Sequence, residues 1–409
     1  MVAGLAYFII VQRLDSAPFK GVVLITFMSA LVSSYSSCVI RKQLSRLPRL
    51  FSKGSLPFYS RLVMSLLVAV TFSLPAAAQN NSFAASSDYF VDKAGSSKFV
   101  LIMAGPTVGD NNKSTFRQWA FSLHDILARD YGYSSESITL LHDQGRKSDE
   151  DEAAAVRVDG AVDLAGITNA LESLQGQVKQ GDQLTIYLIG HGSGADEESK
   201  FNIVGPDITG AQFAEMLSPF AKQDIVIVNT TSASYGFSAS LSSEGRVVIS
   251  STRSPSEKFD PIFSRYFIEA LDQRNGDRDK NNRVSMLEAF NYAKVSVDQW
   301  YEEQGRLASE HAGLDDNGDA LFSLNPAIAD VDGRLAEIAY IDSLVDDSEN
   351  LSSQALSLKA RMQELERSVF ILRGRKADFL EVDYWRQLET LLVELANTTG
   401  EFNDQISQQ

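Results

Sequence analysis

Residues 184–194 constrain the fold most strongly, because an apolar run stops there on a histidine placed between glycines. The run, Leu-Thr-Ile-Tyr-Leu-Ile at 184–189, does not alternate polar with apolar side chains. This pattern is typical of a strand buried on both faces of a parallel sheet that helices cover. Ligands and catalytic groups gather at the carboxyl ends of such strands. Because glycine permits a sharp turn, we expect His191 to be exposed at that end as a candidate functional residue.

The neighbouring sequence alternates between strand and helix patterns over residues 98–272. Helix patterns follow the strand patterns, including one that begins after Asp163, which is a favourable N-cap residue. This alternation predicts an α/β fold with a parallel sheet covered by helices on both faces. The expected strands lie at 98–104, 137–141, 184–191, 224–229 and 246–252, and the expected helices at 114–131, 163–174, 209–217 and 261–271.

The apolar strand at 224–229 runs into a turn of small residues, Thr-Thr-Ser-Ala-Ser-Tyr-Gly-Phe at 230–237, which opens a helix. Together with the strand that ends at His191, this segment resembles the caspase-haemoglobinase fold of caspase-like and legumain-like cysteine peptidases. The resemblance covers residues 98–272. It implies that His191 is the general base or acid and that a cysteine nucleophile follows the second strand. Alignment on Gly236 and Phe237 places Ser232 at that position, and alignment on the strand end places Thr231 there.

Neither of these two residues is a cysteine, and the difference matters chemically. An imidazole readily activates a thiol, whereas a hydroxyl needs a well-oriented base and a preorganised oxyanion site. We therefore expect a catalytically degenerate peptidase fold that serves as a binding scaffold for a peptide or protein partner. The alternative is an active peptidase or other hydrolase in which Ser232 or Thr231 is the nucleophile and His191 the general base.

Residues 277–288 reproduce the twelve-residue spacing of an EF-hand calcium loop, within a segment that spans 273–330. Asn282 stands where glycine is usual, and asparagine tolerates the left-handed conformation required there. The pattern predicts calcium as a structural ion. A second acidic stretch at 315–319 lacks the downstream glutamate, so we expect a solvated turn. The predicted ligands are the side chains of Asp277, Asp279, Asn281, Ser285 and Glu288 and the backbone carbonyl of Arg283.

The region from 331 to 409 changes to long helical patterns without strands. Its apolar residues recur at heptad spacing, which predicts a helical hairpin or a coiled coil. We favour an antiparallel hairpin with a break near Asp383, used for association and open to self-association. The repeating positions are Leu358, Met362, Leu365, Val369, Leu372 and Phe379.

Residues 1–78 have the character of a leader. The segment 61–78 joins a basic flank, a short apolar core and an Ala-Ala-Ala end, which predicts a secretory signal peptide cleaved after Ala78. The preceding 60 residues are either an extended leader or upstream of the true start at Met64, and we favour the latter. A polar linker is expected at 79–97. The mature protein is therefore predicted to be periplasmic or secreted.

Removal of the leader changes the charge and the cysteine content of the chain. Residues 1–78 hold 8 of the 37 basic and 1 of the 53 acidic residues, which leaves 29 basic and 52 acidic residues and a formal charge of −23. Such a charge argues against nucleic acid as a partner. The only cysteine, Cys38, is also lost, so the mature protein has neither a disulfide nor a thiolate nucleophile.

Overall fold

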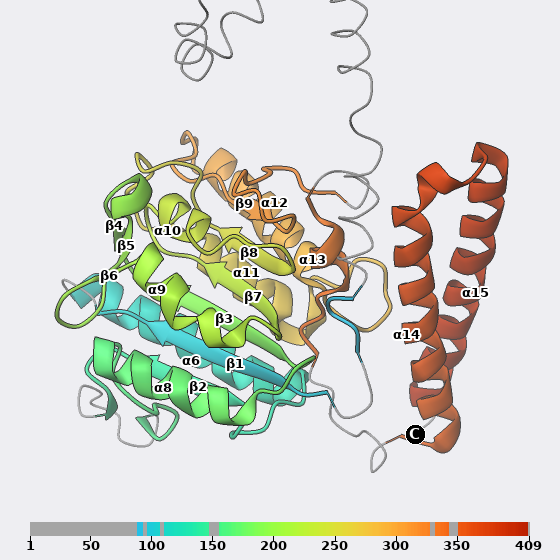
Figure 1. Ribbon diagram of the computed structural model, residues 1–409, viewed down its shortest axis with the longest axis horizontal. Coiled ribbons are helices and arrows are strands. Elements are labelled where there is room, and N and C mark those ends of the chain that lie inside the picture. The colour runs from blue at the N-terminus through green and yellow to red at the C-terminus, as the bar shows by residue number, and fades with distance from the viewer. Residues whose placement is uncertain are drawn as a thin grey trace, which may run out of the picture. The chain divides into compact units, whose positions relative to one another are not determined.

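The computed structural model describes residues 88–92, 96–106, 110–146, 155–327, 332–342 and 351–407, all within one compact unit. Its centre is a six-stranded sheet with the strand order β2-β1-β3-β7-β8-β9 (Figure 1). Strands β1 to β8 of this sheet are parallel, and β9 runs antiparallel to β8. The bounds are β1 (Lys98–Ala104), β2 (Ile138–His142), β3 (Gln183–Ile189), β7 (Asp224–Asn229), β8 (Arg246–Ser250) and β9 (Gly313–Asp315).

The predicted α/β fold with helices on both faces of the sheet is confirmed at this level. One face packs against α6 (Asp110–Asp130), α11 (Phe263–Leu271) and α12 (Met286–Glu303). The other face packs against α8 (Leu164–Gln177), α9 (Gly210–Met216) and α10 (Tyr235–Ala239). Successive strand side chains point to opposite faces, so Val100 and Ile102 enter the first core whereas Leu101 and Met103 enter the second.

Two features of the sheet differ from the sequence prediction. The edge strand β9 is antiparallel. Its three residues, Gly-Leu-Asp, are too few to show a strand pattern, so the sequence did not predict it. The predicted strand through His191 ends at Ile189, and the chain then forms a small antiparallel sheet. That sheet consists of β4 (Gly192–Ser193), β5 (Lys200–Phe201) and β6 (Ile208–Thr209), each too short to show periodicity.

The carboxyl ends of the central strands meet at one edge of the sheet, which positions the site. The strand order reverses between β1 and β3, and ligands bind at such switch points in open α/β sheets. Gly190, at the end of β3, has φ +142, and a Cβ there would lie 3.3 Å from the backbone nitrogen of Gly105, which follows β1. Glycine is therefore needed where the two strand ends approach each other.

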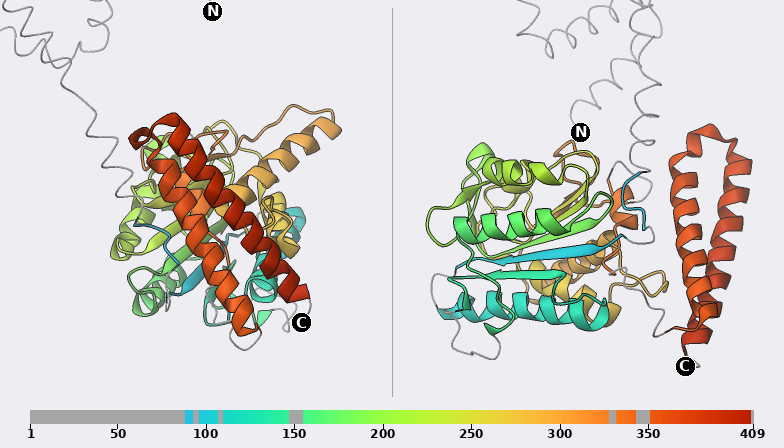
Figure 2. Two further views of the ribbon diagram at one scale, coloured as in Figure 1. Left: turned by 90° about the vertical axis from the view of Figure 1, so that its right-hand side faces the viewer. Right: turned by 60° about the horizontal axis from the view of Figure 1, so that its bottom comes forward.

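The C-terminal region contains α13 (Arg334–Ile338), followed by the antiparallel helices α14 (Ser353–Gly374) and α15 (Glu381–Ser407) (Figure 2). The predicted repeat forms the seam between the last two helices, where Val369 and Leu372 of α14 pack against Tyr384 and Leu388 of α15. The turn lies at residues 375–380, earlier than the predicted break near Asp383, because Gly374 ends α14.

The predicted leader at 1–78 lies outside the described residues, as does most of the predicted linker at 79–97. Among the helices that the structure describes, none is both long enough and apolar enough to span a bilayer.

Candidate functional site

His191 lies directly after β3, with its imidazole between an aromatic ring and a carboxylate. The Phe116 ring of α6 contacts it edge-on, with the ring centroids 5.1 Å apart. Nδ1 lies 2.8 Å from Oδ1 of Asp260, and 22% of the histidine side chain is exposed. A carboxylate at Nδ1 holds the tautomer in which Nε2 is the basic nitrogen. The pair therefore brings together the carboxylate and the imidazole that a general base of this kind uses.

Asp260 is the one member of this site that the sequence analysis did not identify. It lies in the loop between β8 and α11, immediately before Pro261, and no motif marks it. The loops that follow parallel strands share the carboxyl edge of the sheet, so the loop after β8 lies at the same edge as the loop after β3, with β7 between the two strands. An acidic residue anywhere in 253–260 was therefore a candidate partner for His191.

Ser232 reaches the same edge, yet its hydroxyl is bonded to the main chain. Its Oγ accepts a hydrogen bond from the Gly192 N–H at 3.2 Å and lies 3.3 Å from the Gly192 carbonyl oxygen, to which it donates. The residue is buried. A Cβ at Gly192 would lie 2.2 Å from the Ser232 carbonyl oxygen, so only glycine permits this approach. Ser232 thus adjoins the residue after His191 without being bonded to the imidazole.

Thr231 also lies against Gly192, where a Cβ would be 2.9 Å from its Oγ1, but its hydroxyl is bonded within the end of β7. Its hydroxyl donates to Oδ1 of Asn229 at 2.8 Å, and its backbone N–H donates to the same oxygen at 3.1 Å. Both residues are buried, and the Thr231 carbonyl accepts a hydrogen bond from the Ser251 hydroxyl. The structure therefore brings both Ser232 and Thr231 against the His191 loop, and the Thr231 hydroxyl is bonded to Asn229 at the end of β7.

The turn between β7 and α10 is further fixed by a cluster of buried hydroxyls. Ser234 Oγ lies 2.9, 3.2 and 3.0 Å from the hydroxyl oxygens of Ser250, Ser251 and Thr252 respectively. Ala233 has φ +50, a left-handed conformation that is unfavourable for a residue with a Cβ. Its N–H donates to the Glu257 carbonyl at 2.9 Å. The chain itself therefore supplies the contacts that hold this turn.

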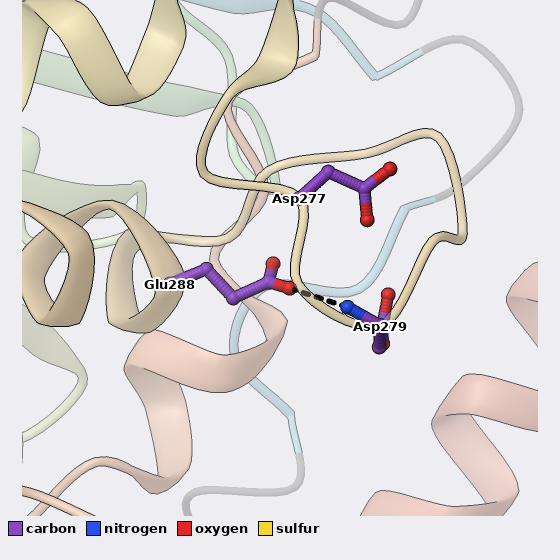
Figure 3. A group of neighbouring side chains, drawn as sticks. All are labelled: Asp277, Asp279 and Glu288. Atoms are coloured by element: carbon purple, nitrogen blue, oxygen red, sulfur yellow. Dashed lines mark hydrogen bonds between the residues drawn. The ribbon is translucent and has the colours of Figure 1, made fainter.

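A separate group of carboxylates lies in the loop before α12 (Figure 3). Carboxylate oxygens of Asp277, Asp279 and Glu288 lie within 4.8 Å of one another. Glu288 Oε1 accepts from the backbone N–H of Arg278 at 3.0 Å, so the glutamate reaches back from α12 across the loop. Asn282 has φ +63, the left-handed conformation that the sequence analysis required at this position. Three of the six predicted ligands thus converge.

The other predicted ligands contribute less directly. The Asn281 Oδ1 accepts from the Arg283 N–H at 2.9 Å, and its Nδ2 donates to Glu366 of α14 at 2.8 Å. The Ser285 hydroxyl caps α12 and donates to Glu288 Oε2 at 2.9 Å. The Arg283 guanidinium leaves the loop and pairs with Asp92 and Glu366.

The electrostatics of the three carboxylates favour a cation. Partial burial, followed by the charges of Glu288 and Asp277, raises the pKa of Asp279 to about 7, although the residue as a whole is exposed. Burial is the largest cause of this shift, and the part that comes from Glu288 and Asp277 is repulsion that a positive ion would relieve. Closely spaced carboxylate oxygens also match the ligands that hard divalent cations prefer. The residues present therefore fit a divalent ion in this loop.

The second acidic stretch, 315–319, is not the solvated turn that was expected. Asp315 and Asp316 are buried, and their carboxylates accept backbone N–H groups. Asp315 binds the N–H groups of Gly318 and Ala320, whereas Asp316 binds that of Ala336 in α13 at 2.9 Å. These bonds join the end of β9 to the start of the C-terminal region.

Comparisons with known proteins do not assign this geometry to a family. The chain matches no model of a known protein family and no curated protein.

Proposed function

We propose that this chain is a periplasmic or secreted protein with a caspase- or legumain-like peptidase fold that is catalytically degenerate. It acts as a calcium-supported binding scaffold for a peptide or protein partner. The fold assignment rests on the histidine after β3 and the small-residue turn after β7, two strands that are neighbours in the sheet. The location rests on the signal-peptide pattern at 61–78.

One observation supports the proposal that the protein has lost catalytic activity. The hydroxyls at both candidate nucleophile positions are bonded to atoms other than the imidazole, Ser232 to Gly192 and Thr231 to Asn229. A serine nucleophile needs a hydrogen bond to its base, because the base must remove the proton during attack. With that contact absent among the described residues, His191 and Asp260 form an acid–base pair without a nucleophile.

The calcium part of the proposal concerns the loop at 277–288. Asp277, Asp279 and Glu288 would hold the ion, and the Arg283 backbone carbonyl completes the spacing of a calcium loop. The ion supplies positive charge that neutralises three crowded carboxylates. Extracellular compartments hold enough calcium to fill even a weak site. In this proposal the ion has a structural role only.

The second candidate function is an active hydrolase, and the contact between His191 and Asp260 favours it. The carboxylate at Nδ1 is the third group that orients a base in hydroxyl-dependent hydrolases. Activity would require a rearrangement that turns the Ser232 hydroxyl from Gly192 toward Nε2. Substrate binding is known to tighten catalytic hydrogen bonds that are long or misaligned in the free enzyme.

A labelling experiment separates the two candidates. The purified protein, with calcium present, is exposed to a fluorescent phosphonate probe that modifies activated serines, and to a library of fluorogenic peptides. The variants Ser232→Ala, His191→Ala and Asp260→Asn are treated in parallel, and a known serine hydrolase serves as the positive control. We expect the wild-type protein to be labelled no more than Ser232→Ala. Labelling or turnover that disappears in both Ser232→Ala and His191→Ala would establish the hydrolase and overturn the scaffold proposal.

A further inference from the structure

The helix α15 has two apolar faces, and only one of them is covered by α14. Tyr384, Leu388 and Phe402 are buried on the covered face. Away from that face, Val382, Trp385 and Leu392 are 70%, 50% and 38% exposed. The structure describes twelve exposed large hydrophobic side chains, and six of them lie within residues 371–393. An apolar surface concentrated in this way marks an interaction site.

The exposed residues follow the spacing of an interhelical seam. Residues 382, 385, 389, 392 and 396 are separated alternately by three and four positions, which places them on one side of a helix. We call this set the outer stripe of α15. Its members are Val382, Trp385, Glu389, Leu392 and Ala396.

The outer stripe contains one charged residue, which identifies its partner. Within the described part of the chain, the Glu389 carboxylate has neither a hydrogen-bond partner nor an ion-pair partner. Arg386 stands beside the stripe and, among the described residues, pairs with Asp383 on its own helix. A carboxylate at the centre of an apolar stripe is costly to bury unless a cation meets it. The partner must therefore bring both an apolar surface and a positive charge.

We propose that the partner is a second copy of this chain, whose outer stripe packs antiparallel against the first. Val382 then faces Leu392 of the second copy, and Trp385 faces Glu389 of the second copy. In this alignment Arg386 of each copy reaches Glu389 of the other, so the two-fold axis generates two equal ion pairs. A parallel pairing would instead place the two Glu389 carboxylates together, and like charges at an interface are repulsive. Charge complementarity thus selects both the second copy and the antiparallel direction.

Trp385 is the expected anchor of this interface. Its ring lies 5.1 Å from the ring of Tyr384, centroid to centroid, and the Lys376 ammonium lies 5.0 Å from its centroid. These contacts orient the indole before association, which lowers the entropy lost on binding. Buried tryptophan and arginine residues carry much of the binding energy in interfaces of this kind.

The inference deepens the proposed binding function by naming a partner for the C-terminal hairpin, and it is independent of catalysis. Sedimentation equilibrium of the full protein from about 1 to about 100 μM is expected to show a reversible dimer. Trp385→Glu is expected to weaken that dimer at least about tenfold, or about 1.4 kcal/mol. The matched control is Leu307→Glu, because Leu307 is 95% exposed but lies outside the hairpin. Circular dichroism melts establish that both variants are folded.

A charge exchange tests the alignment directly. Arg386→Glu and Glu389→Arg are each expected to weaken the dimer, because either change places like charges across the two-fold axis. The double variant with both changes is expected to restore it. A monomeric wild-type protein, or a dimer that Trp385→Glu leaves intact, overturns the proposal. A monomer that sediments with phospholipid vesicles through the outer stripe likewise overturns it, in favour of a membrane surface. Phosphonate labelling reports separately on the sheet edge, so the two proposals can fail independently.

Discussion

The carboxyl edge of the sheet and the acidic loop before α12 both gather polar side chains, but they satisfy them differently. At the sheet edge, Ser232, Thr231 and His191 each bond to another group of the same chain. In the loop, the carboxylates of Asp277, Asp279 and Glu288 also accept backbone N–H groups, but their oxygens lie within 4.8 Å of one another and carry like charges. Buried polar groups that bond to each other need no ligand, whereas crowded like charges are stabilised when a counter-ion binds. We therefore expect a cation to stabilise the loop more than a ligand would stabilise the sheet edge.

The largest effect is expected from Arg283, the residue of the loop whose charge is already paired. Its guanidinium pairs with Asp92 and Glu366 and lies 3.6 Å from the centroid of the Tyr340 ring. The variant Arg283→Met leaves the buried Glu366 carboxylate without its cation, whereas Asp92 keeps Lys98 at 3.4 Å. Breaking a buried pair in this way typically costs about 3–5 kcal/mol of unfolding free energy. Urea denaturation measures this loss.

The control for that experiment is Arg278→Met in the same loop. Arg278 is exposed, and its backbone N–H alone bonds to Glu288. This change is expected to alter the unfolding free energy by less than about 0.5 kcal/mol. If Arg283→Met lost less than about 1 kcal/mol of unfolding free energy, the ion pairs of Arg283 would contribute little to stability, and the expectation would be contradicted.

A pH titration tests whether a buried carboxyl near the sheet edge, that of Glu310, makes the stability of the protein depend on pH. Glu310 is buried there and accepts the N–H groups of Ile262 and Phe263 at the start of α11. Burial raises its pKa from 4.5 to about 7. Because the folded pKa exceeds the unfolded one, the folded state binds the proton more tightly, and stability falls as the pH rises from about 4.5 to about 7.

The size of this effect follows from the shift. One pKa unit corresponds to about 1.4 kcal/mol, so the contribution of Glu310 is on the order of 3 kcal/mol between the two limits. The measurement is the unfolding free energy of the wild-type protein and of Glu310→Gln from about pH 4.5 to about pH 8 in chelator. The variant is expected to have a shallower slope over that interval. Equal slopes would refute the assignment of this pH dependence to Glu310.

Calcium addition tests the acidic loop at 277–288. At a concentration about one hundred times its dissociation constant, a ligand that binds only the folded state stabilises it by about 2.7 kcal/mol. We therefore expect calcium to raise the melting temperature of the wild-type protein relative to chelator. Glu288→Gln should remove this response, because it deletes one charge while glutamine can still complete the capping box with Ser285.

The matched control for calcium is Asp319→Asn in the second acidic stretch. Its Oδ1 accepts the Leu321 N–H at 2.8 Å, and the asparagine oxygen can accept the same bond. The calcium response should persist in this variant. Equal responses in the wild-type protein and Glu288→Gln would exclude the loop at 277–288 as the calcium site.

Local patterns in the sequence were enough to predict the α/β class and the C-terminal helices. They also predicted the sheet strands β1, β2, β3 and β7 and the N-cap at Asp163. These elements are long enough to display a period or end on a residue with a specific capping role. The antiparallel strand β9 and the small sheet after His191 were not, because their strands have two or three residues. Asp260 escaped notice for a related reason, since its role arises only when two loops far apart in sequence meet at one edge.

The smallest expected effect concerns Ser232, and it decides how the sheet edge is understood. Ser232→Ala removes the hydroxyl that bonds to Gly192, and one hydrogen bond contributes about 1 kcal/mol to stability. If Ser232 has a structural role only, this modest loss of unfolding free energy is its whole effect, and peptide binding is unchanged. Gly192→Ala is then far more damaging, because its Cβ would clash with the Ser232 carbonyl. A Ser232→Ala variant of unchanged stability that loses a chemical activity would reverse the comparison and make the edge the functional centre.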